Sequence, residues 1–119
     1  MADLDTVFAA LADPTRRAIL ARLTEGPAGV EELGAPFEIS QPAISKHLKV
    51  LQGAGLVEVD IDGPRRPRRL VAGPLIEATG WLEQTAAAFE ANFRRLDQLL
   101  VAIAEEDTDD TPPAAEDAP

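Results

Sequence analysis

The segment ISQPAISKHLKVLQGAGLVEV, residues 39–59, predicts a helix with one apolar side. Ile44, Leu48 and Leu51 recur at intervals of four and three residues, which places them in one sector of a helix. Ser40 is suited to the start, because its hydroxyl oxygen can accept a hydrogen bond from an otherwise unpaired backbone N–H. We therefore expect a helix that begins after Ser40 and buries this apolar sector.

The opposite side of the same helix carries small or cationic side chains and no carboxylate. These side chains are Gln41, Pro42, Ser45, Lys46 and Lys49. The chain has a formal charge of −10, yet its two lysines and its single histidine, His47, all lie in this segment. A helix face with small and cationic side chains is suited to enter the groove of an anionic duplex.

Length and composition indicate one small domain of the globular class. The chain has 119 residues, 45% of them hydrophobic, and no cysteine, so it forms neither a disulfide nor a thiolate metal site. Its apolar runs are too short to span a bilayer, and its start is not typical of a secretory signal, so we expect a cytoplasmic protein without a membrane partner.

Charge is unevenly distributed along the chain. Residues 105–119 contain seven acidic residues and no basic one, whereas residues 40–70 contain six basic and three acidic residues. Because salt screens each charge over about 8 Å, local charge matters more for a phosphate contact than the total. The overall acidity therefore does not exclude a nucleic-acid partner.

The preceding sequence predicts further helices. Residues 3–11 have a helical apolar spacing, and residues 13–23 repeat it with Asp13 as a candidate cap. A short helix over residues 30–36, joined by a brief turn to the Ser40 helix, makes a helix-turn-helix. The arginines of residues 13–23 can contact phosphates or remain solvated; they are Arg16, Arg17 and Arg22.

A β-hairpin is expected after Gly55, which is suited to the left-handed conformation at a helix end. Within residues 56–61, apolar and acidic side chains alternate from Val57 to Ile61. Asp62 and Gly63 are typical of a turn, and residues 68–72 can return as the second strand. The hairpin carries a cationic cluster, Arg65, Arg66, Arg68 and Arg69. We expect this cluster to contact DNA beside the Ser40 helix.

Residues 74–105 predict a long helix with one continuous apolar face. A single small domain does not cover such a face, so we expect it to form a dimer interface. The predicted dimer contacts are Leu4, Phe8, Leu82, Phe89, Phe93, Leu96 and Leu100. Residues 1–105 would then form one domain with a dimerisation helix, followed by an acidic disordered tail over residues 106–119.

Three motifs resemble the ArsR family of bacterial transcriptional repressors. They are FAALADPTRRAILARL at 8–23, the segment at 39–59, and WLE at 81–83 followed by RRLDQLL at 94–100. The resemblance covers residues 4–104 and implies a mainly α winged helix-turn-helix with a small β-hairpin wing, dimeric through its terminal helices. By position it implies that the exposed face beginning at Gln41 meets the major groove and that the arginine cluster belongs to the wing.

The sequence departs from the metal-sensing members of this family. Those members carry a Cys-x-Cys pair before the recognition helix, or His and acidic ligands on the last helix. Here the corresponding stretch is EELGAPF, residues 31–37, and the last helix lacks histidine. We expect no metal site of the thiolate or imidazole kind and no cofactor.

The resulting prediction is a homodimeric repressor that binds an imperfect palindrome in double-stranded DNA and is associated with the nucleoid when bound. Its predicted DNA contacts are Gln41, Pro42, Ser45, Lys46, His47, Lys49, Arg65, Arg66, Arg68 and Arg69. An enzyme is not expected, because Ser45 and His47 diverge on one helix. Two alternatives stay open: a winged-helix protein-interaction module, and a repressor with a pocket for a small apolar effector near Trp81, Phe89 and Phe93.

Overall fold

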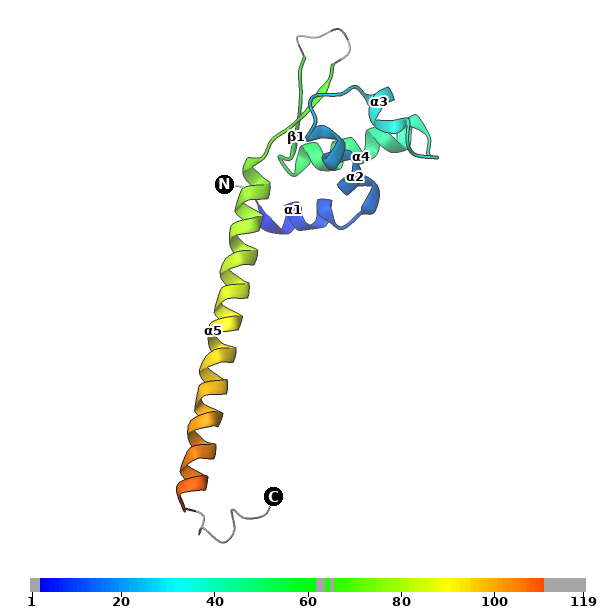
Figure 1. Cartoon of the computed structure of the whole chain (residues 1–119). Helices are drawn as coiled ribbons and strands as arrows, with labels where there is room; N and C mark the ends of the chain where they lie inside the picture. Colours follow the sequence, from blue (N-terminus) through cyan, green and yellow to red (C-terminus); the bar gives the residue numbers. More distant parts are fainter. Residues whose placement is uncertain (1–2, 62–63, 65, 111–119) are drawn as a thin grey trace. The chain divides into compact units, whose positions relative to one another are not determined.

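The computed structural model describes residues 3–61, 64 and 66–110. Its elements, in chain order, are α1 (Leu4–Leu11), α2 (Pro14–Leu23), α3 (Val30–Gly34), α4 (Gln41–Gly53), β1 (Val57–Val59), β2 (Arg68–Leu70) and α5 (Gly73–Asp110). The chain divides into two units, Met1–Trp81 and Leu82–Pro119. This mainly α architecture with one hairpin confirms the predicted winged helix-turn-helix (Figure 1).

Side-chain caps begin the two central helices, as predicted. The Asp13 carboxylate accepts a hydrogen bond from the backbone N–H of Arg16 at 3.0 Å, and the Ser40 hydroxyl accepts one from the N–H of Ala43 at 3.2 Å. A proline follows each cap in the first turn, where its missing N–H removes no helical hydrogen bond. These local signals fix where α2 and α4 begin.

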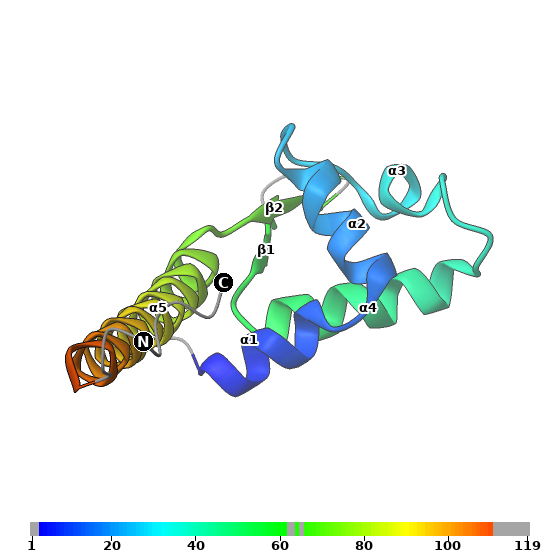
Figure 2. The ribbon, with the colours of Figure 1, turned by 60° about the horizontal axis from the view of Figure 1, so that its bottom comes forward.

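The apolar side of α4 forms part of the core of the first unit. Ile44, Leu48 and Leu51 are buried, as predicted. Helices α1, α2 and α3 all contact α4, and Figure 2 shows them grouped about it. The other core residues include Val7, Ala10, Ile19, Leu20, Leu23, Leu33, Leu56, Val57 and Ala78. Burial of each large side chain stabilises the fold by about 1.5–3 kcal/mol relative to exposure.

The turn into α4 carries two apolar side chains, Phe37 and Ile39, that differ in burial. Phe37 packs against the core, but Ile39 is 41% exposed. Gly34 lies close to α4, since a Cβ atom at this position would meet Ile44 Cγ1 at 3.1 Å. The close approach of α3 and α4 therefore depends on this glycine.

The hairpin follows α4 through Gly55, whose φ of +77° confirms the predicted left-handed conformation. Strands β1 and β2 pair antiparallel, with Val57 opposite Leu70 and Val59 opposite Arg68. Both strands are shorter than predicted, and Ile61 is exposed rather than part of β1. The predicted turn at 62–63 lies outside the described residues.

A third segment joins β2, which the sequence did not indicate. The backbone of Ala28 exchanges two hydrogen bonds with that of Arg68, at 2.8 and 3.1 Å. Ala28 precedes α3 and is itself buried. The pairing therefore ties the base of the hairpin to the helix-turn-helix.

The first turns of α5 belong to the first unit. Ala78 is buried and Leu75 packs against the core. The Trp81 ring meets the Phe8 ring edge to face, with the centroids 5.9 Å apart. These contacts agree with the expectation that the start of the long helix packs on Phe8.

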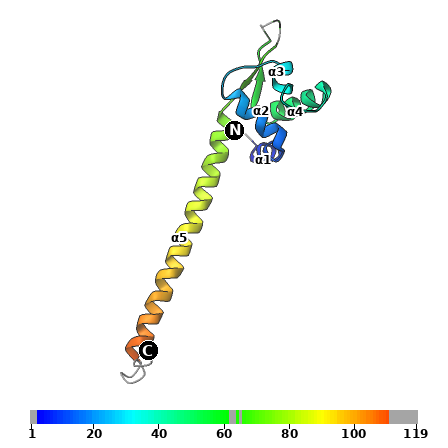
Figure 3. The same cartoon turned by 45° about the vertical axis from the view of Figure 1, so that its right-hand side comes forward.

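The second unit consists of the rest of α5, which Figures 1 and 3 draw as one continuous helix. It ends at Asp110, later than the predicted end at Glu105, so the disordered tail expected from residue 106 was placed too early. Residues 111–119 lie outside the described residues. In the described part of the chain, no helix carries an apolar stretch long enough to cross a membrane.

We expect Ser40→Ala to lower the free energy of unfolding by about 1 kcal/mol, because the N–H of Ala43 loses its acceptor. Urea unfolding followed by circular dichroism measures this change. Ser45→Ala is the matched control, since it removes the same hydroxyl from the middle of α4. Equal losses in the two variants would contradict the capping role.

Asp13 makes the stability depend on pH. The backbone N–H of Arg16 holds the pKa of this carboxyl below its ordinary value, with smaller contributions from the Arg16 charge and the backbone N–H of Thr15. A carboxyl whose pKa is lower in the folded chain stabilises the fold above its unfolded pKa, and this contribution is lost as the pH falls through the folded pKa. We expect wild-type stability to decrease below pH of about 4.

Asp13→Asn should weaken this decrease, because an amide does not titrate. Urea unfolding at pH 6 and at pH 3 gives the difference for each protein. Asp5→Asn, a change of an exposed carboxylate on α1, serves as the control. The same loss of stability in Asp13→Asn as in the wild type would show that Asp13 is not responsible.

Candidate nucleic-acid interface

One face of α4 is open, and it carries the predicted base-reading residues. Gln41, Pro42, Lys46 and Lys49 are exposed, and Ser45 is half-buried. A surface hollow of about 580 Å³ lies along this face, lined by Pro42, Ala43, Ser45, Lys46 and Lys49. The structure thus brings Pro42, Ser45, Lys46 and Lys49 together on one surface, whereas the exposed Gln41 at the start of α4 lines a different hollow, beside α3.

The electrostatics of this face favour an anionic ligand. Helix α4 contains Lys46 and Lys49 but neither aspartate nor glutamate. The N-terminus of a helix also carries a partial positive charge from its unpaired N–H groups. A phosphate backbone can therefore approach the start of α4 without meeting a carboxylate from this helix.

His47 lies apart from the hollow that the lysines line. Its half-buried ring lies beside the start of α2, where Nδ1 is 3.3 Å from Arg16 Nη1 and 3.9 Å from Asp13 Oδ2. The second distance is too long for a hydrogen bond, so Arg16 is the closer partner. The structure therefore places His47 at an internal contact of the domain.

The hairpin arginines are not equivalent. Arg66 is exposed and has a φ of +45°, a left-handed conformation that is uncommon for a residue with a side chain. Arg68 is half-buried and donates through Nη1 to the carbonyl oxygen of Arg66 at 2.8 Å. Arg69 forms an ion pair and hydrogen bond with Glu58 across the hairpin. Arg65 lies outside the described residues.

The arginines of α2 bind backbone carbonyl groups. Arg17 Nη1 donates to the carbonyl oxygen of Leu11 at 2.8 Å, and Arg22 Nη1 donates to that of Gly26 at 3.3 Å. Arg16 donates to carbonyl oxygens near the end of α1. Each of these side chains thus has a hydrogen-bond partner within the fold, and phosphate contact by them stays a prediction.

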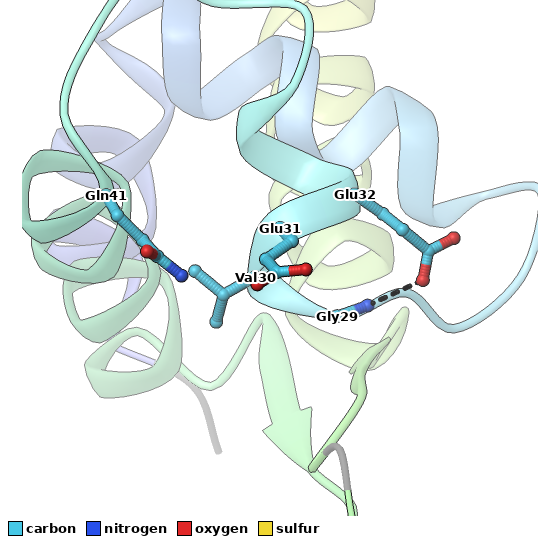
Figure 4. A pocket seen from close by; sticks show the side chains of 5 residues that line it. All are labelled: Gly29, Val30, Glu31, Glu32 and Gln41. Atoms are coloured by element: carbon cyan, nitrogen blue, oxygen red, sulfur yellow. Dashed lines mark hydrogen bonds between the residues drawn. The ribbon is translucent and has the colours of Figure 1, made fainter.

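A second hollow, of about 390 Å³, lies between α3 and the start of α4. It is lined by Gly29, Val30, Glu31, Glu32 and Gln41 (Figure 4). Glu32 Oε1 accepts from the N–H of Gly29 at 3.2 Å, and Glu32 Oε2 is 3.6 Å from Arg22 Nη2. Its two carboxylates make this hollow unsuitable for a phosphate, so DNA is expected on the lysine side of α4.

The aromatic residues predicted to border an effector pocket lie in two places. Trp81 contacts Phe8 in the first unit. In the second unit, the Phe89 and Phe93 rings stack with centroids 6.5 Å apart. With Glu90 and Arg94 they line a shallow hollow of about 310 Å³.

The described residues offer no group of three or more His, Asp or Glu side chains arranged to hold a metal ion. Two carboxylates close to α4 have other partners: Asp13 caps α2, and Glu32 binds Gly29 and Arg22. The chemistry that this surface offers is therefore hydrogen bonding and charge pairing.

Comparison with known proteins agrees with this geometry. A family model described as a helix-turn-helix domain matches residues 11–60. The transcriptional regulator Rv2034 of Mycobacterium tuberculosis is 50% identical over 66 residues, which are 56% of this chain and 59% of that protein. The transcriptional repressor SdpR of Bacillus subtilis is 41% identical over 54 residues, 45% of this chain and 60% of that one. The chain thus matches less than two thirds of the length of either relative.

Solved structures extend the likeness to the whole fold. A crystal structure of an ArsR family transcriptional regulator is 38% identical, with a TM-score of 0.68 over 73% of this chain and 96% of that one. A homodimeric winged helix-turn-helix DNA-binding domain from Mycobacterium bovis is 29% identical, with a TM-score of 0.55 over 75% of this chain and 82% of that domain. With 38% identity across nearly all of an ArsR family structure, the chain belongs to the ArsR family of transcriptional regulators.

Proposed function

We propose that this protein is a homodimeric, non-enzymatic repressor that binds double-stranded DNA in the bacterial cytoplasm and nucleoid. The observation that carries the proposal is the two-sided α4: Ile44, Leu48 and Leu51 are buried, while Lys46 and Lys49 lie on an open face without carboxylates. A helix supported in this way can enter a major groove without losing its packing on the domain.

On this face, three residues are suited to read bases. Gln41 at the start of α4 can form paired hydrogen bonds with adenine, Lys46 can donate to guanine, and the Ser45 hydroxyl can donate or accept. Each well-formed paired contact contributes about 1–3 kcal/mol of discrimination. Pro42 adds apolar contact surface, and Lys49 is suited to a phosphate.

The wing is proposed to bind the backbone or the minor groove beside this site. Arg65, Arg66 and Arg68 supply the charge that phosphate neutralisation requires. Arg69 contributes less, because Glu58 already neutralises much of its charge. The rigid support for these contacts is the pairing of β2 with both β1 and Ala28.

Dimerisation would use the apolar side chains of α5. Leu82, Phe89, Phe93, Leu96 and Leu100 are each between 51 and 69% exposed. A continuous apolar face of this kind on one helix is typical of a protein–protein interface. Two copies joined there would present their α4 helices to major grooves about 34 Å apart, as an imperfect palindrome requires. Leu4 and Phe8 would lie at the margin of this interface.

Binding of a small apolar effector is a second proposed property of the same repressor. The stacked Phe89 and Phe93 rings, with their adjoining hollow, are the observation that favours it. A ligand bound there would meet the surface that is proposed to join the subunits. A protein-interaction module without DNA binding has no comparable feature in its favour, and the DNA measurement below distinguishes it.

We expect Lys49→Ala to reduce the slope of log binding constant against log salt by about 1, because Lys49 is assigned to a phosphate. Lys46→Ala should relax base preference at one position, because Lys46 is assigned to a base edge. Selection from a random DNA library identifies the preferred site, and fluorescence anisotropy at several salt concentrations gives the slopes.

Arg94→Ala is the matched control, because it removes a cation that belongs to the second unit and not to α4. It should leave the slope unchanged. A wild-type slope in Lys49→Ala, or an unchanged base preference in Lys46→Ala, would contradict the proposed face. Failure to select any DNA sequence, together with binding to an acidic protein surface, would favour the interaction module.

We expect Phe89→Asp and Leu96→Asp to convert the dimer to a monomer, because each places a charge in the apolar face of α5. Sedimentation velocity measures the change. Gln98→Asp, a polar position of the same helix, should leave the dimer intact. A dimer that persists in both apolar variants would show that another surface joins the subunits.

A further inference from the structure

Arg16 connects three helices within the first unit. Its side chain projects from α2, and Nε and Nη2 donate to the carbonyl oxygens of Ala10 and Ala9 at 2.7 and 3.1 Å. These carbonyls lie in the last turn of α1, where a helix lacks intrahelical donors and carries partial negative charge. The remaining nitrogen, Nη1, lies 3.3 Å from Nδ1 of His47 on α4.

The contact between Arg16 and His47 specifies which ring nitrogen carries the proton. Guanidinium groups only donate hydrogen bonds, so His47 Nδ1 must accept. A ring held in this contact carries its proton on Nε2. Asp13 does not reverse this assignment, because its Oδ2 is 3.9 Å from Nδ1 and already accepts from the N–H of Arg16.

The position of His47 makes this contact relevant to recognition. It follows Lys46 directly and lies between the buried positions Ile44 and Leu51 of α4. Apolar packing alone allows a helix to shift or rotate slightly, since such contacts are not directional. A hydrogen bond is directional, so one made by a side chain in the middle of α4 limits these shifts and rotations.

We propose that Arg16 is a positioning residue for DNA recognition. Through His47 it fixes both the ring tautomer and the orientation of α4 on the corner formed by α1 and α2. Sequence discrimination then depends on Arg16, whereas general affinity for DNA depends on the lysines and the wing. This inference rests on the proposed DNA-binding function.

The first measurement needs no DNA. His47 is the only histidine, so its two ring ¹⁵N resonances in the full-length protein are unambiguous. We expect a proton-bearing Nε2 and an acceptor Nδ1 in the wild type, and a mixture of tautomers in Arg16→Gln. A wild-type ring protonated on Nδ1 would overturn the proposal.

The second measurement compares the selected operator with a random duplex. Loss of a hydrogen bond to a charged group corresponds to a roughly tenfold loss of discrimination. We expect this loss in Arg16→Gln and His47→Leu, with random-duplex affinity and salt slope unchanged. His47→Asn should recover discrimination to within about twofold, because its side-chain oxygen can accept from Arg16 near the position of Nδ1.

Arg17→Gln is the matched control, since Arg17 is on the same helix but donates to the carbonyl of Leu11 and not to α4. It should discriminate as the wild type does. If Arg16→Gln does not fold, the comparison of His47→Asn with His47→Leu decides the matter. Equal losses in those two variants, or a salt slope reduced by about 1 in Arg16→Gln, would overturn the proposal.

The two proposals can fail separately. A wild-type protein that prefers no DNA sequence contradicts the proposed function itself. A wild type that discriminates well while Arg16→Gln also discriminates fully contradicts only the role of Arg16.

Discussion

Burial of one side of α4 is the constraint on which the rest of the structure depends. Ile44 and Leu51 are fully inaccessible and Leu48 nearly so, which sets the rotation of the helix about its axis to within a small range. Because side chains on a helix repeat about every 3.6 residues, this rotation also determines that Lys46 and Lys49 face outward. The same packing that stabilises the domain therefore selects the surface available to a partner.

The arginines show how an acidic protein keeps a cationic surface. Arg16, Arg17 and Arg22 bind carbonyl groups of the fold, and Arg69 binds Glu58. Arg's planar group is suited to such multiple, directed hydrogen bonds, whereas Lys offers a single compact charge. The open face of α4 carries the two lysines, whose charge is left for a phosphate. The net charge of −10 thus says little about this surface.

Features encoded by neighbouring residues could be predicted from the sequence. The caps at Asp13 and Ser40, the buried stripe of α4 and the left-handed Gly55 all follow from local spacing and side-chain chemistry. The contact of His47 with Arg16 and the pairing of Ala28 with β2 could not, because both depend on partners distant in the chain. The end of α5 at Asp110 also had a local signal, because no glycine or proline interrupts the chain between Gly80 and Pro112. The acidic composition of the last residues instead indicated disorder there.

The helix-turn-helix is held on two sides, which limits how its DNA affinity could be regulated. On one side α3 approaches α4 so closely that Gly34 has no room for a larger side chain without movement of Ile44. On the other, Arg16 joins α4 to the end of α1. Glu32, which binds both Gly29 and Arg22, further fixes α3 to α2. Rearrangement within this helix-turn-helix would break several contacts at once. A change in the spacing between the helix-turn-helix motifs of two subunits would break none of these contacts. In a homodimer, regulation through the α5 interface therefore requires less free energy than regulation through α4 itself.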